Sequence, residues 1–140
     1  MASYVKFEVF SENLAEKVHN LDTDTLMVML TNTAPNAATN TVKADITEIS
    51  AGNGYTAGGA DTTNATSRSG GTTTVTAVDV VWTASGGTIG AFRYVVLYND
   101  TPTSPADPLI AYWDYGSSIT LNAGETFTVD FGSNSLMTIA

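Results

Sequence analysis

The sequence of 140 residues contains no cysteine, a single histidine, five basic residues and no long apolar run. The absence of cysteine excludes disulfides, thiolate nucleophiles and cysteine-ligated zinc sites. No stretch approaches the roughly 20 consecutive apolar residues that a membrane-spanning helix needs. We therefore expect a soluble, unprocessed chain that has no membrane partner.

The shortage of basic residues makes the chain strongly acidic. It carries 14 aspartates and glutamates against five lysines and arginines, which gives a formal net charge of −9. A surface with this charge repels polyphosphates and nucleic acids over most of its area. We therefore expect no nucleic-acid partner.

The residues that are abundant favour strands and turns. Thr, Ser, Asn, Gly and Ala supply most of the small and polar positions, a composition that suits short strands better than helices. A chain of this length is the size of one domain with one core. We expect residues 1–140 to form a single, mainly β domain, an antiparallel β-sandwich of jelly-roll-like type with one short N-terminal helix.

The N-terminal segment, residues 1–10, has apolar and charged side chains alternating from Val5 to Val9. A period of two predicts an extended segment, which is either an arm or an edge strand. A terminal strand can pair with an exposed sheet edge through its main chain. The segment could therefore pair with a partner's sheet or dock into its own.

A short helix is expected next, with Ser11 as its N-cap. Leu14, Val18 and Leu21 then recur at i, i+4 and i+7 and form one apolar stripe. His19 lies near the expected end of this helix, where a cation is favourable. We interpret it as a capping residue in preference to a catalytic one.

The first half of the chain continues with two expected strands and a glycine-rich segment. Leu26–Leu30 is apolar at every position, which predicts a strand covered on both faces. A second strand is plausible at 42–49. Residues 52–71 have almost no large apolar side chain except Tyr55, which predicts a long surface loop. Such a loop is either a contact surface or a disordered connector.

The glycines at the start of this loop do not indicate a nucleotide site. A phosphate-binding glycine loop joins a buried strand to a helix, often with a lysine nearby. No helical pattern follows Gly59, and no lysine follows Lys43. We interpret these glycines as turn positions that need a positive φ.

The second half of the chain shows the clearest strand signal. Apolar residues alternate in several runs, and turn residues separate the runs, as in antiparallel sandwiches. The expected strands lie at 78–82, 92–98, 109–115 and 127–131, and the expected turns at 85–87, 99–108, 115–117 and 122–124.

Candidate chemistry is sparse. The acid pairs Asp22 with Asp24, and Asp107 with Asp114, are where a calcium site or a glycosidase would be sought. Neither pair lies in a recognisable ligand loop, and Asp22 to Asp24 is better explained as the turn between helix and strand. We expect no enzyme, no catalytic residue, no cofactor and no metal site.

Aromatic residues are the other candidate for a binding surface. Tyr112–Tyr115 contains three aromatic residues and, with Trp82 and Tyr98, resembles the sugar-binding platform of a carbohydrate-binding module. Alternation along a strand would place Tyr112 and Trp113 on opposite faces. The core is therefore the favoured place for about half of these rings, and an exposed sugar or partner site is the alternative for the rest.

Four blocks of sequence resemble a family of small structural proteins of tailed bacteriophages. The blocks are NLAEKVHNLDTDTLMVMLTNTAP, ADITEISAGNGYTAGG, FRYVVLYNDTP and PLIAYWDYGSSITLNAGETFTVDF, and together they span nearly the whole chain. The resemblance implies a virion component, which is either a capsid decoration (cement) protein or a tail or fibre component. It brings no enzymatic residues with it.

The resemblance leads us to expect a cement protein that is made in the host cytoplasm and lies on the capsid exterior. Its partners would be the major capsid protein and itself, as a dimer or trimer. The alternatives are a tail or fibre component that contacts host-surface glycan, and an unrelated carbohydrate-binding module. The expected partner-binding residues are Tyr4, Lys6, Phe7, Tyr55, Arg68 and Tyr112.

Overall fold

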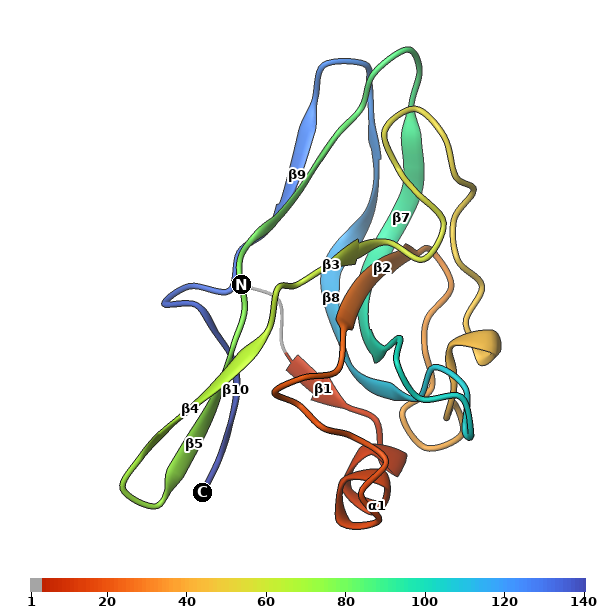
Figure 1. The fold of residues 1–140 in the computed structure, drawn as a ribbon. Coiled ribbons are helices and arrows are strands. Elements are labelled where there is room, and N and C mark those ends of the chain that lie inside the picture. Colours follow the sequence, from red (N-terminus) through yellow and green to blue (C-terminus); the bar gives the residue numbers. More distant parts are fainter. Residues whose placement is uncertain (1–3) are drawn as a thin grey trace.

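The computed structural model describes residues 4–140, so the first three residues of the expected N-terminal arm lie outside the described residues. This part of the chain forms ten strands, one α-helix and one 3-10 helix (Figure 1). The helices are α1 (Val9–Ala15) and η1 (Lys43–Asp45), and neither is long and apolar enough to cross a membrane. The strands are β1 (Tyr4–Lys6), β2 (Leu26–Thr31), β3 (Ala60–Asp61), β4 (Ala65–Ser69), β5 (Thr72–Thr76), β6 (Val80–Thr83), β7 (Ile89–Asn99), β8 (Leu109–Leu121), β9 (Thr126–Val129) and β10 (Ser135–Ile139).

The largest sheet of the described chain has five strands in the order β1-β8-β7-β2-β3, and neighbouring strands are antiparallel. β2 lies between β7 and β3, and Leu26, Val28 and Leu30 are fully buried. Met29 on the opposite face is also fully buried, so the continuous apolar run forms an inner strand, as predicted.

Two smaller antiparallel sheets complete the β structure of residues 4–140. β6 pairs with β9, and β10, β5 and β4 form a sheet in that order. In Figure 1 the β4–β5 hairpin projects away from the rest of the molecule, and β9 lies at the opposite end beside the far halves of β7 and β8.

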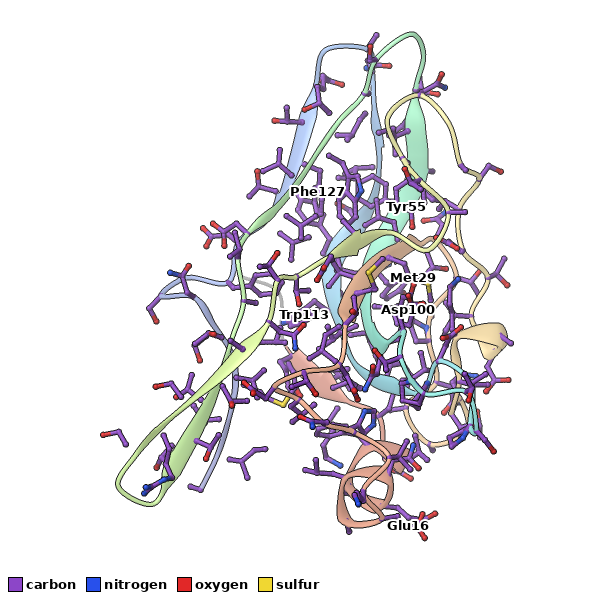
Figure 2. All side chains as sticks on the ribbon, in the orientation of Figure 1. Glu16, Met29, Tyr55, Asp100, Trp113 and Phe127 are labelled. Atoms are coloured by element: carbon purple, nitrogen blue, oxygen red, sulfur yellow. The ribbon has the colours of Figure 1, made fainter. Side chains whose placement is uncertain are left out.

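One core joins the three sheets. Its buried side chains come from every sheet, including Val28 of β2, Val75 of β5, Trp82 of β6 and Phe92 of β7. Figure 2 shows Phe127 projecting from β9 toward the large sheet, where its ring meets Phe92 at 4.9 Å, whereas Glu16 projects outward beyond α1. The packing is sandwich-like, and the predicted mainly β, antiparallel fold with a short N-terminal helix is confirmed. The jelly-roll connection pattern stays a prediction.

The helix differs from its prediction in position and length. α1 begins at Val9, before the expected cap Ser11, and ends at Ala15, so it does not reach Leu21. It ends early because Lys17 takes a left-handed φ of 65°, and the N–H of Val18 closes the turn on the carbonyl of Asn13. Leu21 is still buried, but it lies in the turn that follows.

The strand expected at 42–49 is wrong. The segment starts with η1, and the carboxylate of Asp45 accepts hydrogen bonds from the backbone N–H groups of Thr41 and Val42 at 2.9 and 3.2 Å. These bonds hold the pKa of Asp45 below its usual range. An Asp side chain that captures nearby backbone N–H groups favours a turn over a strand ladder.

The long surface loop expected at 52–71 is also wrong in large part. Gly52 and Tyr55 form a tight reciprocal pair of backbone hydrogen bonds, and β3 and β4 occupy much of the remainder. β4 pairs with the Thr-rich β5 along its full length. Thr and Ser side chains suit a pleated strand, so polarity alone was a poor guide to a loop here.

The turn expected at 115–117 is absent, since β8 runs through it and stays paired with β7 as far as Leu121. Gly116 has a φ of 101° and its N–H binds Asp114, where the register of the pairing shifts. Glycine therefore marks an irregularity within a long strand and not its end.

Gly59 is a point where the fold requires glycine. Its φ is +85°, and an added Cβ would lie 1.8 Å from the carbonyl oxygen of Val28. Gly59 immediately precedes β3, so this approach lets β3 pair with β2. Gly70, in the β4–β5 turn, also has a positive φ of +59°, but an added Cβ would meet open space.

We predict that Gly59→Ala lowers the free energy of unfolding by about 4 kcal/mol or more, which is exceptional for one substitution. The matched variant Gly70→Ala has only a left-handed backbone to accommodate, at about 1–2 kcal/mol. Urea unfolding monitored by tryptophan fluorescence measures both values. Equal midpoints for the two variants would contradict the close approach of Gly59 to β2.

Candidate functional site

The predicted N-terminal segment docks into its own sheet. β1 pairs with β8 through Tyr4 opposite Trp113 and Lys6 opposite Ala111, and β1 ends the strand order, so its other side has no strand partner in residues 4–140. Tyr4 is 40% exposed and rests its ring against Trp113 at 5.6 Å. Tyr4 and Lys6 are thus exposed side chains on an open sheet edge, which we call the β1 edge.

Phe7 follows β1 directly and, unlike Tyr4 and Lys6, points into the protein. Its side chain is fully buried, its ring packs against Tyr112 at 5.4 Å, and its N–H binds the carbonyl of Ile110. Tyr112 is half-buried and also meets Tyr94. Phe7 therefore anchors β1 and presents no surface to a partner, contrary to its place among the expected contact residues.

Tyr55 is likewise an anchor and not a surface residue. It is 2% exposed, and its hydroxyl donates to the Glu48 carboxylate at 2.7 Å while accepting the N–H of Leu30 at 3.0 Å. Burial raises the pKa of Tyr55 well above its usual value, and Glu48 adds to the rise. The phenol therefore stays protonated and keeps donating to Glu48.

Glu48 connects several parts of the glycine-rich segment, although no pattern in the sequence predicts this role. The same carboxylate oxygen also accepts the N–H of Gly58 at 2.6 Å, and its other oxygen lies 3.9 Å from the Lys43 ammonium. Lys43 lies over the ring of Tyr98, whose hydroxyl donates to the Gly58 carbonyl at 2.6 Å. We call this group, Lys43, Glu48, Tyr55, Gly58 and Tyr98, the Glu48 cluster, and its hydrogen bonds attach the glycine-rich segment to β2 and β7.

Arg68 belongs to a different part of the surface. It is exposed on β4, the outer strand of the three-stranded sheet, and its guanidinium donates to the carbonyl of Gly70 at 2.9 Å. Its place on the projecting β4–β5 hairpin (Figure 1) leaves it accessible, on a different sheet from the β1 edge. The structure therefore places Tyr4 and Lys6 on one surface and Arg68 on another. It buries Phe7 and Tyr55 and leaves Tyr112 half-buried.

The remaining aromatic residues follow the expected alternation. Trp113 faces Phe131 and Tyr115 faces Phe127, whereas Tyr112 lies on the other side against Phe7. Trp82 and Tyr98 are 4% and 1% exposed, so the core interpretation is right for both. Tyr115, at 53% exposure, is the most exposed ring among the described aromatic residues.

The acid pairs show no shared site. Asp24 accepts the N–H of Asn20 within the predicted turn, whereas Asp22 accepts the N–H and hydroxyl of Thr66 on β4. Asp114 is held by Arg93 at 2.8 and 3.0 Å, and this pairing lowers its pKa. Within residues 4–140, no three His, Cys, Asp or Glu side chains are grouped so that they could hold a metal ion.

The pKa of Asp107, the other member of the second pair, shifts in the opposite direction. Burial raises the pKa of Asp107, and the nearby Asp100 raises it further. Asp107 and Asp114 thus titrate in different environments, as paired catalytic acids do. However, they share no neighbour: the pKa of Asp107 is affected by Asp100 and Lys43, and that of Asp114 by Arg93. We assign no reaction to them.

His19 is not a helix cap, because α1 ends four residues before it. The ring is 6% exposed and packs on Phe10 at 5.2 Å. Its Nδ1 is 3.0 Å from the amide nitrogen of Asn99, which also donates to Asp24 at 2.7 Å. Sequence analysis missed this cluster because Asn99 is 80 residues from His19 along the chain.

Comparisons with known proteins add no relative. No protein-family model, no curated protein and no solved structure matches the chain.

We predict that Tyr55→Phe lowers the free energy of unfolding by about 1–3 kcal/mol, because it leaves the Leu30 N–H and a Glu48 oxygen without their buried partner. Tyr115→Phe is the matched control, since that phenol is 53% exposed. Its removal should change stability by less than about 0.5 kcal/mol. Denaturant unfolding measures both, and equal losses would show that the hydroxyl of Tyr55 is not an anchor.

Proposed function

We propose that this protein is a capsid decoration (cement) protein that binds the outside of the major capsid protein lattice of a tailed bacteriophage and stabilises it. The observation that carries the proposal is the ordered resemblance of four sequence blocks, which spans nearly the whole chain. The four blocks in this order are more specific than any one of them.

The geometry of the β1 edge supports such a role. An open edge offers main-chain N–H and C=O groups to an added strand, while neighbouring side chains give specificity. Tyr4 is exposed there, and aromatic side chains are frequent anchors of protein interfaces, while the exposed Lys6 adds a positive charge to the same edge. The projecting β4–β5 hairpin with Arg68 provides a second surface for a neighbouring subunit (Figure 1).

The size of the chain also suits a lattice protein. A component repeated over a symmetric shell gains affinity from multivalency, so each copy can bind through a modest contact. A dimer or trimer would increase this gain by engaging several capsid subunits at once. We propose self-association of this kind as part of the same function.

The second candidate is a tail or fibre component that contacts host-surface glycan. Tyr4 and Tyr115 favour it, because both rings are exposed and sugars stack on aromatic faces. Of the aromatic platform expected for an isolated carbohydrate-binding module, Trp82 and Tyr98 are buried and Tyr112 and Trp113 are half-buried, so Tyr115 is its one exposed ring. The cement protein is therefore the preferred proposal.

The location of the protein on the virion tests the proposal directly. We predict density for this chain on the outer icosahedral shell in a cryo-EM reconstruction, with the β1 edge or the β4–β5 hairpin against capsid subunits. Density confined to the tail or fibres would reject the cement function and support the glycan-binding alternative. Absence from purified particles would reject both.

A binding variant tests the β1 edge in the same system. We predict that Tyr4→Ala weakens binding to capsid shells that lack this protein by roughly tenfold, a typical loss for an exposed aromatic anchor. Val81→Ala is the matched control, because Val81 is also exposed but lies on β6. Co-sedimentation measures both variants after unfolding has shown that they are equally stable. Equal binding would exclude Tyr4 as a contact.

A further inference from the structure

The connection between α1 and β2 is tied to the end of β7 by one buried polar cluster. Asn99, the last residue of β7, is fully buried and donates both amide hydrogens, one to Asp24 at 2.7 Å and one to Nδ1 of His19 at 3.0 Å. His19 and Asp24 both belong to the connection, residues 16–25. We call these three residues the His19 latch.

The orientation of Asn99 fixes the protonation state of His19. The Asn99 Oδ1 accepts the N–H of Thr101 at 3.1 Å, so its nitrogen must be the atom that faces Asp24 and His19. A flipped amide would set an oxygen against the Asp24 carboxylate and an N–H against an N–H. Nδ1 of His19 is therefore an acceptor, and the neutral ring carries its proton on Nε2.

Protonation of the ring would break this arrangement. A second proton on Nδ1 would face the amide hydrogen of Asn99, so that two donors meet at 3.0 Å. Nε2 has no hydrogen-bond partner among the described residues and is shielded from solvent. The buried imidazolium would therefore have two N–H groups and no acceptor, which is strongly unfavourable.

Asp24 is the charged group that acts on His19. On the same connection, the carboxylate of Asp22 is hydrogen-bonded to Thr66, and Lys17 is exposed. On the side of α1 the ring packs on Phe10, and the charged residues there, Glu12 and Glu16, are exposed. From β7 it meets Asn99, and Asp100 follows in the chain. His19 lines a groove between the connection and the strands β4, β5 and β10. These strands contribute only uncharged residues to the groove: Thr66, Thr73, Val75 and Ile139.

Desolvation outweighs the attraction of Asp24. Burial lowers the pKa of His19, and the nearby carboxylate offsets the effect only in part. The released ring in water has an ordinary pKa of about 6.5, so the open form binds the proton more tightly than the closed form. Acid therefore favours opening, and the closed form is fully stabilised above that pH.

We infer that the His19 latch is an acid-sensitive conformational switch. When His19 takes up a proton, its ring leaves Asn99, either for the Asp24 carboxylate or for solvent. Either movement breaks the contact between His19 and Asn99, and the connection separates from the end of β7. The sheets remain folded, because their ladders contain no group of the latch except the terminal residue of β7.

Hydrogen exchange of the wild-type chain tests the switch. The N–H groups of Asn20 and Asp24 are hydrogen-bonded within the connection, and that of Val18 binds Asn13 of α1, so these three amides report its opening. Their opening constant, corrected for intrinsic exchange, should rise by roughly tenfold per pH unit below about pH 6.5, until the pKa of the closed form is reached. Amides of β2 should not change. The ¹⁵N spectrum of the ring should show the Nε2–H tautomer at neutral pH.

His19→Asn is the matched variant, because an Asn oxygen can accept from Asn99 but does not titrate. We predict that this variant loses the pH dependence between pH 6.5 and 5. If it fails to fold, the wild-type titration still decides the matter. A ring that titrates near pH 6.5 without change in exchange, an opening constant that is flat over this range, or a variant with unchanged pH dependence would each overturn the switch.

Discussion

The hydroxyl of Tyr55 is the contact on which the arrangement of the first half of the chain depends. It accepts the N–H of Leu30 in the inner strand β2 and donates to Glu48, which in turn holds Gly58. A segment that is otherwise small and polar is thereby fixed against the most buried strand of the molecule. Because Gly59 follows immediately and lies against the backbone of Val28, β3 can complete the sheet.

The described chain makes little use of ion pairs. Residues 4–140 contain two ion pairs, Lys43 with Glu48 and Arg93 with Asp114. Turns are instead closed by short polar side chains on nearby backbone N–H groups, such as Asp45 on Thr41 and Asn36 on Ala38. Hydrogen bonds of this kind are local and suit a chain with few cations. The carboxylates that accept backbone N–H groups in this way are stabilised in their charged form by the dipoles of those groups. This offsets part of the repulsion expected from a net charge of −9.

Local periodicity predicted the fold where local contacts determine it. The runs that contain Leu26, Val80, Phe92 and Leu109 formed strands, because alternation or continuous apolarity reports burial directly. The predicted helix begins and ends too far along the chain, since the end of α1 depends on the left-handed turn at Lys17. The glycine-rich segment was misread because Tyr55 is fixed by Glu48 and Leu30, partners that no local pattern identifies.

The candidate site was predicted only in part for the same reason. Exposure of Tyr4, Lys6 and Arg68 follows from polarity and terminal position, whereas the burial of Phe7 depends on Tyr112, more than 100 residues away. Sequence alone gives the period of a strand but not which neighbour it meets. The His19 latch was invisible for this reason too, because its members come from two distant segments.

The burial of Phe7 also restricts how the β1 edge can engage a partner. If a partner strand replaced β8, β1 would leave its sheet and expose Phe7, at a cost of about 1.5–3 kcal/mol for the ring alone. It would also lose the hydrogen bond from Phe7 to Ile110. A strand that adds to the open side of β1 meets neither cost and leaves Tyr4 and Lys6 available. Addition at the edge, with β1 kept in place, is therefore the mode of binding that the packing of Phe7 favours.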